Sequence, residues 1–174
     1  MDDRFYPLDR FRYYLPPYPK LVFCDSVFGL FGYLVRKRTK GMYSHFMWEL
    51  SPGVFASQGV LFKRFSLEHY RDYHLKFVVN VRWGKYEQNL LRVAIEDDLQ
   101  RKWYSNAYDI IGVLGKLFGI NEINSSLNFC SERGRYLGLV EHDYDLKAPT
   151  PSDLNEWTKA RRDRFKVVGR YSPD

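Results

Sequence analysis

The segment SSLNFCSERGRYLGL places one cysteine, Cys130, just before a run of residues typical of a helix. If Asn128 caps that helix, Cys130 lies in its first turn, where unpaired backbone N–H groups carry partial positive charge. This position stabilises a thiolate, and the same N–H groups can hold the oxyanion that forms when sulfur attacks a carbonyl. An adjacent imidazole would also be needed to take the thiol proton. The pattern therefore predicts a nucleophilic cysteine, provided that a histidine folds beside it.

His45 is the histidine best suited to that role, because it opens an apolar run, HFMW, that is typical of a buried strand. A histidine at the end of a buried strand can meet a cysteine at the start of a packed helix. The other three histidines lie in polar, charged stretches and are expected at the surface: His69, His74 and His142. The alternative for both Cys130 and His45 is a purely structural place in the core, where unpaired cysteines often lie. The second cysteine, Cys24, is expected in the core.

Several segments, taken in order, resemble the circularly permuted NlpC/P60 papain-like proteins, which include the YiiX-like group. LVRKRTKGMYSHFMW resembles the segment around the histidine of that family. Later segments resemble its following elements: VFASQGVLFKRFSLEHY, KFVVNVRW, YDIIGVLGKLFGIN, NFCSERGRYLGL and APTPSDL. The resemblance covers Leu21 to Leu154, and the histidine precedes the cysteine, which is the order of the permuted form.

The resemblance implies that Cys130 is the nucleophile and His45 the general base of a cysteine hydrolase. Such an enzyme cleaves an amide or related acyl bond through an acyl-enzyme, and peptide amides of peptidoglycan are the leading substrate class. Glu132 matches an acidic residue of the family and is expected to support the pair from the helix start. Three further residues match family elements and are candidates to line the pocket: Ser44, Tyr108 and Asp109. For Asp109 a structural role is the equal alternative.

The residue that orients the imidazole is less clear from the sequence. The family carries a third polar residue on the strand after the histidine strand, but the corresponding position here is Phe55. Ser57, Gln58 and Glu49 are the candidates to replace it. Without an orienting partner, a histidine can adopt the wrong tautomer and lose orders of magnitude in rate. The alternative function is therefore a non-catalytic or weakly active structural or adaptor component, for example of a phage virion, on the same fold.

The pattern of elements predicts an α+β fold, and the resemblance makes it a permuted papain-like one, with a small antiparallel sheet or half-barrel packed with helices. The Ser51-Pro52-Gly53 turn between two β-rich runs indicates a hairpin. Thr150-Pro151-Ser152-Asp153 is typical of a capped helix start. The expected strands are residues 21–23, 43–50, 54–65 and 76–81, and the expected helical or apolar segments are 28–40, 66–73, 86–101, 107–118, 128–139 and the helix from 151.

The chain of 174 residues is long enough for one packed domain. Residues 1–20, rich in Pro and Tyr, are expected to form an extended arm, and residues 21–174 a single domain with a basic C-terminal helix or tail. Both the arm and the tail are suited to gripping a partner protein. The formal net charge of +6 is compatible with an anionic cell-wall polymer.

Other features argue against several classes of protein. Two cysteines make neither a disulfide framework nor a metal cluster, and no cofactor is expected. We expect neither a signal peptide nor a membrane span, and no recognised nucleic-acid-binding motif is present. The expectation is synthesis in the cytoplasm, followed in the virion alternative by incorporation into a larger particle.

Overall fold

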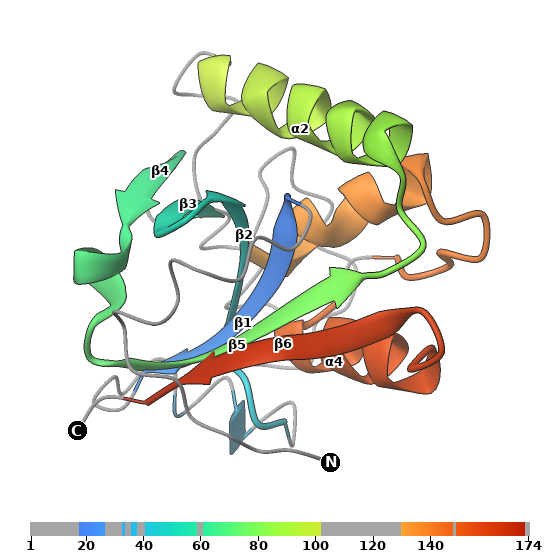
Figure 1. The fold of residues 1–174 in the computed structure, drawn as a ribbon. Coiled ribbons are helices and arrows are strands. Elements are labelled where there is room, and N and C mark those ends of the chain that lie inside the picture. The colour runs from blue at the N-terminus through green and yellow to red at the C-terminus, as the bar shows by residue number, and fades with distance from the viewer. Residues whose placement is uncertain are drawn as a thin grey trace.

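The computed structural model describes residues 18–26, 33, 36–37, 41–58, 61–101, 130–147 and 149–172. These residues form an open six-stranded sheet and helices that pack against it (Figure 1). The strands are β1 (Lys20–Ser26), β2 (His45–Ser51), β3 (Val54–Gln58), β4 (Phe62–Ser66), β5 (Tyr73–Asn80) and β6 (Phe165–Tyr171). The helices are α2 (Lys85–Gln100), η4 (Cys130–Leu139), α4 (Pro151–Ala160) and the single short turn η2 (Leu67–Tyr70).

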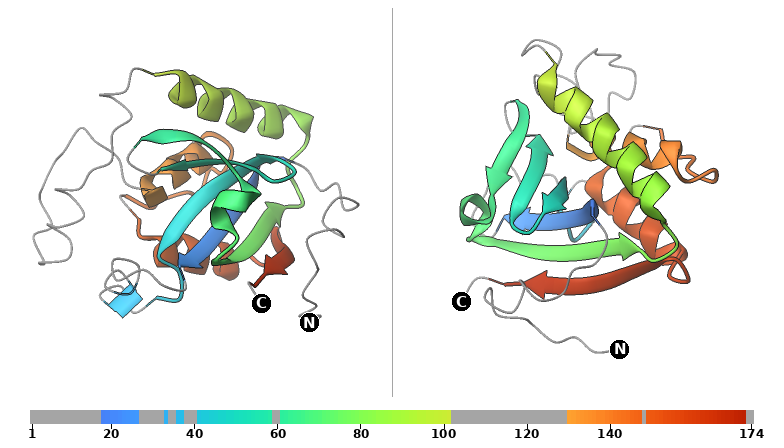
Figure 2. Two further views of the ribbon diagram at one scale, coloured as in Figure 1. Left: turned by 90° about the vertical axis from the view of Figure 1, so that its left-hand side faces the viewer. Right: turned by 45° about the horizontal axis from the view of Figure 1, so that its top comes forward.

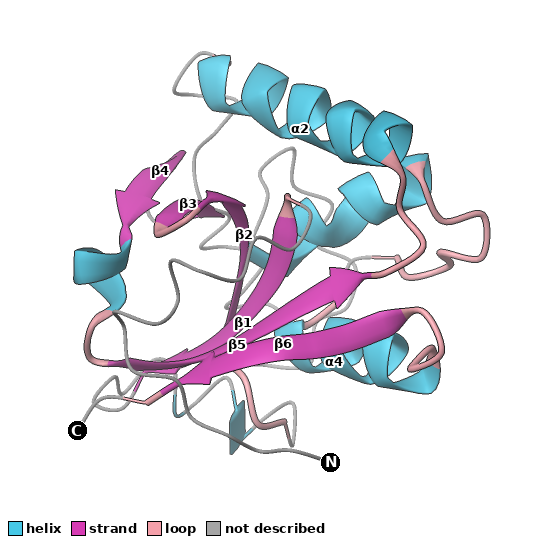
Figure 3. Cartoon of the chain, in the orientation of Figure 1, coloured by secondary structure: helices cyan, strands magenta, loops and turns pink. Residues whose placement is uncertain are grey.

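The strand order is β4-β3-β2-β1-β5-β6, and every neighbouring pair is antiparallel. β1 therefore lies near the middle of the sheet, between β2 and β5. Figure 3 shows the strands as one continuous surface with the helices around it. This arrangement confirms the expected combination of helices with a small antiparallel sheet.

The sheet is strongly curled. On a flat sheet β3 and β5 would lie three strand spacings apart, or about 14 Å. The rings of Phe55 on β3 and Phe77 on β5 nevertheless lie with their centroids 6.3 Å apart. The concave face thus closes over an apolar cluster of its own: Val22, Cys24, Met47, Phe55, Tyr70, Leu75 and Phe77.

The opposite face of the sheet carries the larger core and the longer helices. Phe46 and Trp48 point to this face, where the cluster also includes Leu91 and Ile95 of α2 and Leu154 of α4. In the left view of Figure 2 the strands lie in front, with η4 and α4 behind them. Because side chains alternate along a strand, His45 and Met47 point the other way, to the concave face.

The hairpin at Ser51-Pro52-Gly53 is confirmed, since β2 pairs with β3 across this turn. Gly53 has φ +70°, a left-handed conformation that favours glycine. The expectation of one strand over residues 54–65 is wrong. The chain breaks after Gln58 and returns as β4, which pairs antiparallel with β3.

Both long helices begin where the sequence predicted. α2 starts after Gly84, whose N–H donates to Glu87 Oε2 at 2.9 Å. At α4, Thr150 Oγ1 accepts from the N–H of Asp153 at 3.2 Å, and the Asp153 carboxylate accepts from the N–H of Thr150 at 2.8 Å. This is the reciprocal cap expected from the sequence.

The shorter expected elements are also present. The helix expected over residues 66–73 is the turn η2, which Ser66 precedes. The strand expected over 76–81 is β5, and the apolar residues 21–23 lie inside β1. Each differs from the expectation by a few residues at its ends.

η4 is a 3-10 helix over residues 130–139. Trp48 Nε1 donates to the carbonyl oxygen of Arg133 at 3.0 Å, which fixes η4 against β2. Gly134 lets η4 approach α4, because a Cβ atom at this position would lie 2.7 Å from Leu154 Cδ1. Asn128, the expected cap, lies outside the described residues.

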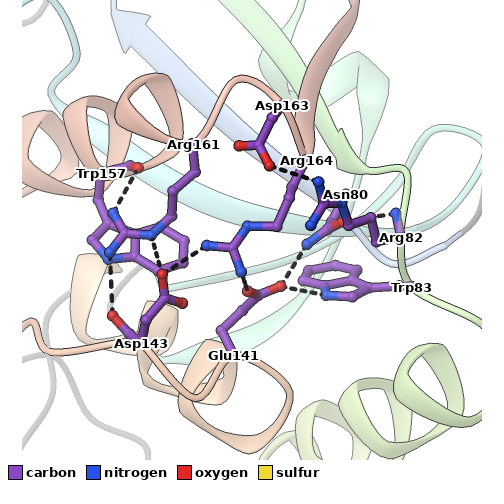
Figure 4. A network of polar contacts seen from close by, with 9 residues as sticks. All are labelled: Asn80, Arg82, Trp83, Glu141, Asp143, Trp157, Arg161, Asp163 and Arg164. Carbon is purple, nitrogen blue, oxygen red and sulfur yellow. Dashed lines mark hydrogen bonds and ion pairs between the residues drawn. The ribbon is translucent and has the colours of Figure 1, made fainter.

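The basic C-terminal segment departs from the expectation of a tail. After α4 the chain turns and forms β6, which pairs with β5 along the edge of the sheet. Figure 4 shows the ionic network beside this turn. Arg164 donates to Glu141 and to Asp143, each at 2.7 Å, and Arg161 donates to Asp143 at 2.7 Å.

Some expectations fall outside the described residues: residues 1–17 of the arm, most of the helix expected over 28–40, and the apolar run 107–118. Of the arm, Tyr18 and Pro19 are described, and Lys20 already belongs to β1. Among the helices of the described residues, none combines the length and apolar character that crossing a bilayer requires.

Candidate functional site

His45 is held at the start of β2 by contacts with the end of β1. Cys24 and His45 are paired residues of the two strands. The N–H of Ser44 donates to the carbonyl oxygen of Cys24 at 3.2 Å, and Ser44 Oγ donates to Asp25 Oδ1 at 3.3 Å. Asp25 also forms an ion pair with Arg36. Ser44 therefore helps to fix the backbone that carries the histidine.

The imidazole of His45 contacts Ser57 on the next strand. His45 Nε2 and Ser57 Oγ lie 2.7 Å apart, which is a hydrogen bond. Ser57 is paired with Met47, so it lies diagonally across from His45 on the same concave face. The bond uses one ring nitrogen and leaves Nδ1 as the position from which the ring could act on a substrate or a thiol.

The ring of His45 is neutral at physiological pH. Burial, with a smaller contribution from His69, lowers the pKa of His45 from 6.5 to about 4. An imidazole of this kind can accept a proton but does not stabilise a thiolate as a resident cation. Any chemistry at His45 therefore begins from the neutral ring, as in general-base catalysis.

Tyr70 lies on the concave face with Ser57. Burial raises the pKa of Tyr70, whereas the Ser57 side chain acts in the opposite direction. Tyr70 is 4% exposed and belongs to the concave-face cluster. The sequence reasoning missed it; the only signal was an aromatic residue in the otherwise charged stretch SLEHYRDYH.

Cys130 begins η4 and is 5% exposed. Burial raises the pKa of the Cys24 thiol, and Cys130 acts on it in the same direction. Cys130 acts in the same direction on the pKa of Tyr70. Cys24 is paired with His45 on the neighbouring strand.

The remainder of η4 lies on the opposite face from the imidazole. Trp48, which contacts Arg133, is three residues beyond His45 and points away from it. His45 lies at the start of β2, at the rim of the sheet, and Cys130 is the first described residue of η4, which contacts β2 through Trp48 and Arg133. Direct proton transfer between the two residues requires Cys130 Sγ and His45 Nδ1 to lie within hydrogen-bond reach of each other.

The other two candidates for orienting the imidazole have different roles. Glu49 forms a buried ion pair with Lys20 at 2.7 Å. Gln58 points to the opposite face of the sheet, where its Oε1 accepts from Arg133 at 2.8 and 2.9 Å. Three other expected site residues cannot be placed: Tyr108 and Asp109 lie outside the described residues, as does the side chain of Glu132.

Arg133 is a second residue that sequence reasoning missed. It is 1% exposed, donates to Asp98 Oδ2 at 2.6 Å, and stacks over Phe62 with its guanidinium carbon 4.2 Å from the ring centroid. The buried guanidinium therefore ties η4 to α2 and β4 three residues after Cys130. Nothing in the local pattern SERGRY distinguishes this arginine from an exposed one.

Among the described residues, the other histidines, Cys24 and the acidic side chains do not form a second candidate site. His69, His74 and His142 are exposed, as expected, and Cys24 is fully buried, as expected. Within the described part of the chain, no group of three or more His, Cys, Asp or Glu side chains is arranged to hold a metal ion. The rim with Cys24, His45, Ser57, Tyr70 and Cys130 is the site that we consider further.

Comparison with known proteins adds no assignment. None of the known protein-family models matches the chain, and no curated protein matches its sequence.

Proposed function

We propose that this protein is a cysteine hydrolase that uses Cys130 and His45 to cleave an amide or related acyl bond, on a permuted papain-like fold. The observation that carries the proposal is the 2.7 Å hydrogen bond between His45 Nε2 and Ser57 Oγ. A polar partner on one ring nitrogen is what a general base needs in order to present the other nitrogen in a defined state. Ser57 supplies this partner from the strand that follows the histidine strand.

The proposed reaction has two stages. As Cys130 Sγ attacks the carbonyl carbon, its proton passes to His45 Nδ1, and the imidazolium then gives that proton to the leaving amine. The product of this stage is a thioester on Cys130. His45 next takes a proton from a water molecule that attacks the thioester, which releases the acid and regenerates the thiol.

The start of η4 would hold the oxyanion of each stage. Backbone N–H groups in the first turn of a helix have no partner within the helix and point along its axis. Cys130 is the first described residue of η4, and in the proposed reaction backbone N–H groups of this part of the helix face the developing oxyanion. The same groups favour the thiolate, which compensates in part for the neutral resting state of His45.

Peptide amides of peptidoglycan are the substrate class that we favour. The net charge of +6 agrees with an anionic polymer, and the segment resemblance agrees with NlpC/P60 enzymes. Incorporation into a virion or another assembly is compatible with this activity. The same mechanism would also hydrolyse an acyl bond in a lipid or in another protein.

Alkylation of the thiol tests the proposal directly. Intact-protein mass spectrometry after treatment with iodoacetamide should show modification of Cys130 in the Cys24→Ala variant and none in the Cys24→Ala/Cys130→Ala variant. Adding His45→Ala to Cys24→Ala should slow the modification by about tenfold or more, because the base that removes the thiol proton is lost. Equal rates with and without His45, in variants with the same circular dichroism, would contradict an activated thiol.

The burial of the site favours a second candidate, a non-catalytic structural component on the same fold. Cys130 is 5% exposed, so a substrate reaches the sulfur only if the rim opens. Under this alternative Cys130 is modified only under conditions that unfold the protein. The concentration of urea at which labelling begins therefore separates the two candidates.

A further inference from the structure

We propose that η2 is a lid over the concave face of the sheet, with the ring of Tyr70 as its plug and the end of β6 as its latch. η2 connects β4 to β5 as a single helical turn. The opening of such a lid is a property of the folded chain. Only its meaning for substrate access rests on the proposed hydrolase function.

One side chain anchors the segment around η2 in the interior. Within residues 63–74, Tyr70 is the only buried residue, at 4% exposure. Its ring lies edge-on to Phe55 of β3, with the two centroids 5.5 Å apart, and it belongs to the concave-face cluster that includes Cys24. Segments with few buried contacts open locally before the rest of a domain unfolds. Withdrawal of this one ring is therefore enough to uncover part of the concave face.

The area that Tyr70 covers adjoins His45. Phe55 and Ser57 lie two residues apart on β3, so their side chains are on the same face of the sheet. Ser57 Oγ in turn lies 2.7 Å from His45 Nε2. A substrate held at His45 can therefore extend over Phe55 only when the ring of Tyr70 has left it.

The two ends of η2 are fastened differently. At its start, the N–H of Leu67 donates to the carbonyl oxygen of Gly53 at 2.9 Å, in the turn between β2 and β3. Just after its end, the carbonyl oxygen of Arg71 accepts a hydrogen bond from the hydroxyl of Tyr171 at 2.7 Å. The first fastening joins two backbone groups, whereas the second depends on one side chain from the far end of the chain.

The latch consists of Tyr171 and Ser172. Tyr171 is the last residue of β6 and is paired with Leu75 of β5. Ser172 Oγ lies 2.9 Å from His74 Nδ1. Both side-chain contacts lie at the surface, where water competes for the same groups. The end of η2 is therefore the one that releases, and the start, beside the hairpin, serves as the hinge.

Alkylation of Cys24 tests the lid without any substrate, in the Cys130→Ala variant, where it is the remaining thiol. Cys24 is 0% exposed and shares a cluster with Tyr70, so N-ethylmaleimide reaches it only through an opening. Tyr171→Phe removes one hydroxyl and should raise the labelling rate about fivefold, the value of one hydrogen bond. Tyr86→Phe, at an exposed position on α2, is the matched control and should leave the rate unchanged.

Further variants separate a lid from general destabilisation. Tyr70→Leu loses the ring contacts and should accelerate labelling about tenfold or more. Ser172→Ala should also accelerate it and covers the case in which Tyr171→Phe does not fold. Labelling through a local opening depends on urea less steeply than global unfolding does, because less surface is exposed. Rates that match global unfolding in every variant, or latch variants that label no faster than Tyr86→Phe, would overturn the lid.

Alkylation of Cys130 in the Cys24→Ala variant separates the lid from the proposed function. If Tyr171→Phe accelerates the labelling of Cys24 but His45→Ala does not slow that of Cys130, the lid stands and the hydrolase proposal fails. If His45→Ala slows the labelling of Cys130 but the latch variants leave that of Cys24 unchanged, the lid fails and the hydrolase proposal stands. Both hold if each variant has its expected effect.

Discussion

The imidazole of His45 is enclosed on the concave face of the sheet and has a serine hydroxyl as its hydrogen-bond partner. An enclosed ring of this kind is more stable neutral than protonated, because a cation there would lose its hydration. The same property that makes His45 a base also makes the fold sensitive to acid. The proposed catalytic role of His45 and a cost in stability thus follow from one environment.

The pH dependence of folding should report this cost. The pKa of His45 is about 4 in the folded chain against 6.5 for an ordinary histidine. Above pH 6.5 the neutral ring does not reduce the free energy of unfolding. As the pH falls from 6.5 toward 4 this free energy decreases, because the unfolded chain binds the proton more readily than the folded chain. The loss should reach about 3 kcal/mol at pH 4.

Urea unfolding at pH 7.5, 5.5 and 4.5 checks this expectation. His45→Gln, which keeps an amide N–H for Ser57, should remove most of the loss, whereas His142→Gln, at an exposed position, should leave it unchanged. If wild type and His45→Gln lost stability in parallel, the ring would not be the group responsible.

The choice of partner for His45 shows what a sequence can predict at this scale. Ser57 and Gln58 are adjacent and both polar, and a shift of one position in the register exchanges them between the two faces. The sequence therefore predicted the strand and the set of candidates but could not distinguish between them. Tyr70 was invisible for a different reason, since only the folding of η2 onto the concave face brings it to Ser57.

The position of η4 depends on its close packing against α4. Gly134 faces Leu154, which is fully buried, and a Cβ atom at position 134 would lie 2.7 and 2.8 Å from the two Cδ atoms. Leu154 is surrounded by other core side chains and cannot move aside into solvent. A side chain at position 134 must therefore separate the two helices or displace a core residue.

Substitution by alanine measures this close approach. Gly134→Ala should lower the free energy of unfolding by about 1–3 kcal/mol through overpacking. Gly138→Ala is the matched control, because its Cβ would lie at an ordinary 3.5 Å from Tyr144 Cδ1. Guanidinium unfolding at pH 7.5 gives both values. Equal effects of the two substitutions would mean that helix propensity, and not the contact with Leu154, governs position 134.

At the scale of elements the sequence predicted local structure well and pairing poorly. The hairpin and the start of α4 follow from residues close in the chain, Ser51-Pro52-Gly53 and Thr150 with Asp153. β6 was missed because FKVVGRY follows a run of arginines and resembles a polar tail. What makes it a strand is its pairing with β5, more than 80 residues away, about which local pattern carries no information.

The ionic network drawn in Figure 4 links segments that lie far apart in the chain. Glu141, which is 5% exposed, accepts from Trp83 Nε1 at 2.7 Å and from Arg164 at 2.7 Å. It also accepts from Asn80. One carboxylate thus joins the segment after η4 to the end of β5 and to the turn that leads into β6.

Replacing the Glu141 carboxylate by a neutral amide should weaken the contacts between these segments and destabilise the fold. Glu141→Gln keeps the shape but presents an amide to three donors, and we expect a loss of about 2–4 kcal/mol in the free energy of unfolding. Asp163→Asn is the control, since Asp163 pairs with Arg82 at 2.8 Å with both side chains mostly exposed. That exposed pair should contribute about 0.5 kcal/mol or less. Thermal unfolding measures the two variants side by side, and similar losses would argue against a linking role for Glu141.

Within the described residues, β4 and β6 are the two edges of the open sheet, and an edge strand is where another chain can pair with a sheet. Each edge carries an exposed lysine, Lys63 on β4 and Lys166 on β6. Two copies that met along these edges would crowd ammonium groups together at the seam. We expect this repulsion to oppose aggregation of the protein through the edges of its sheet.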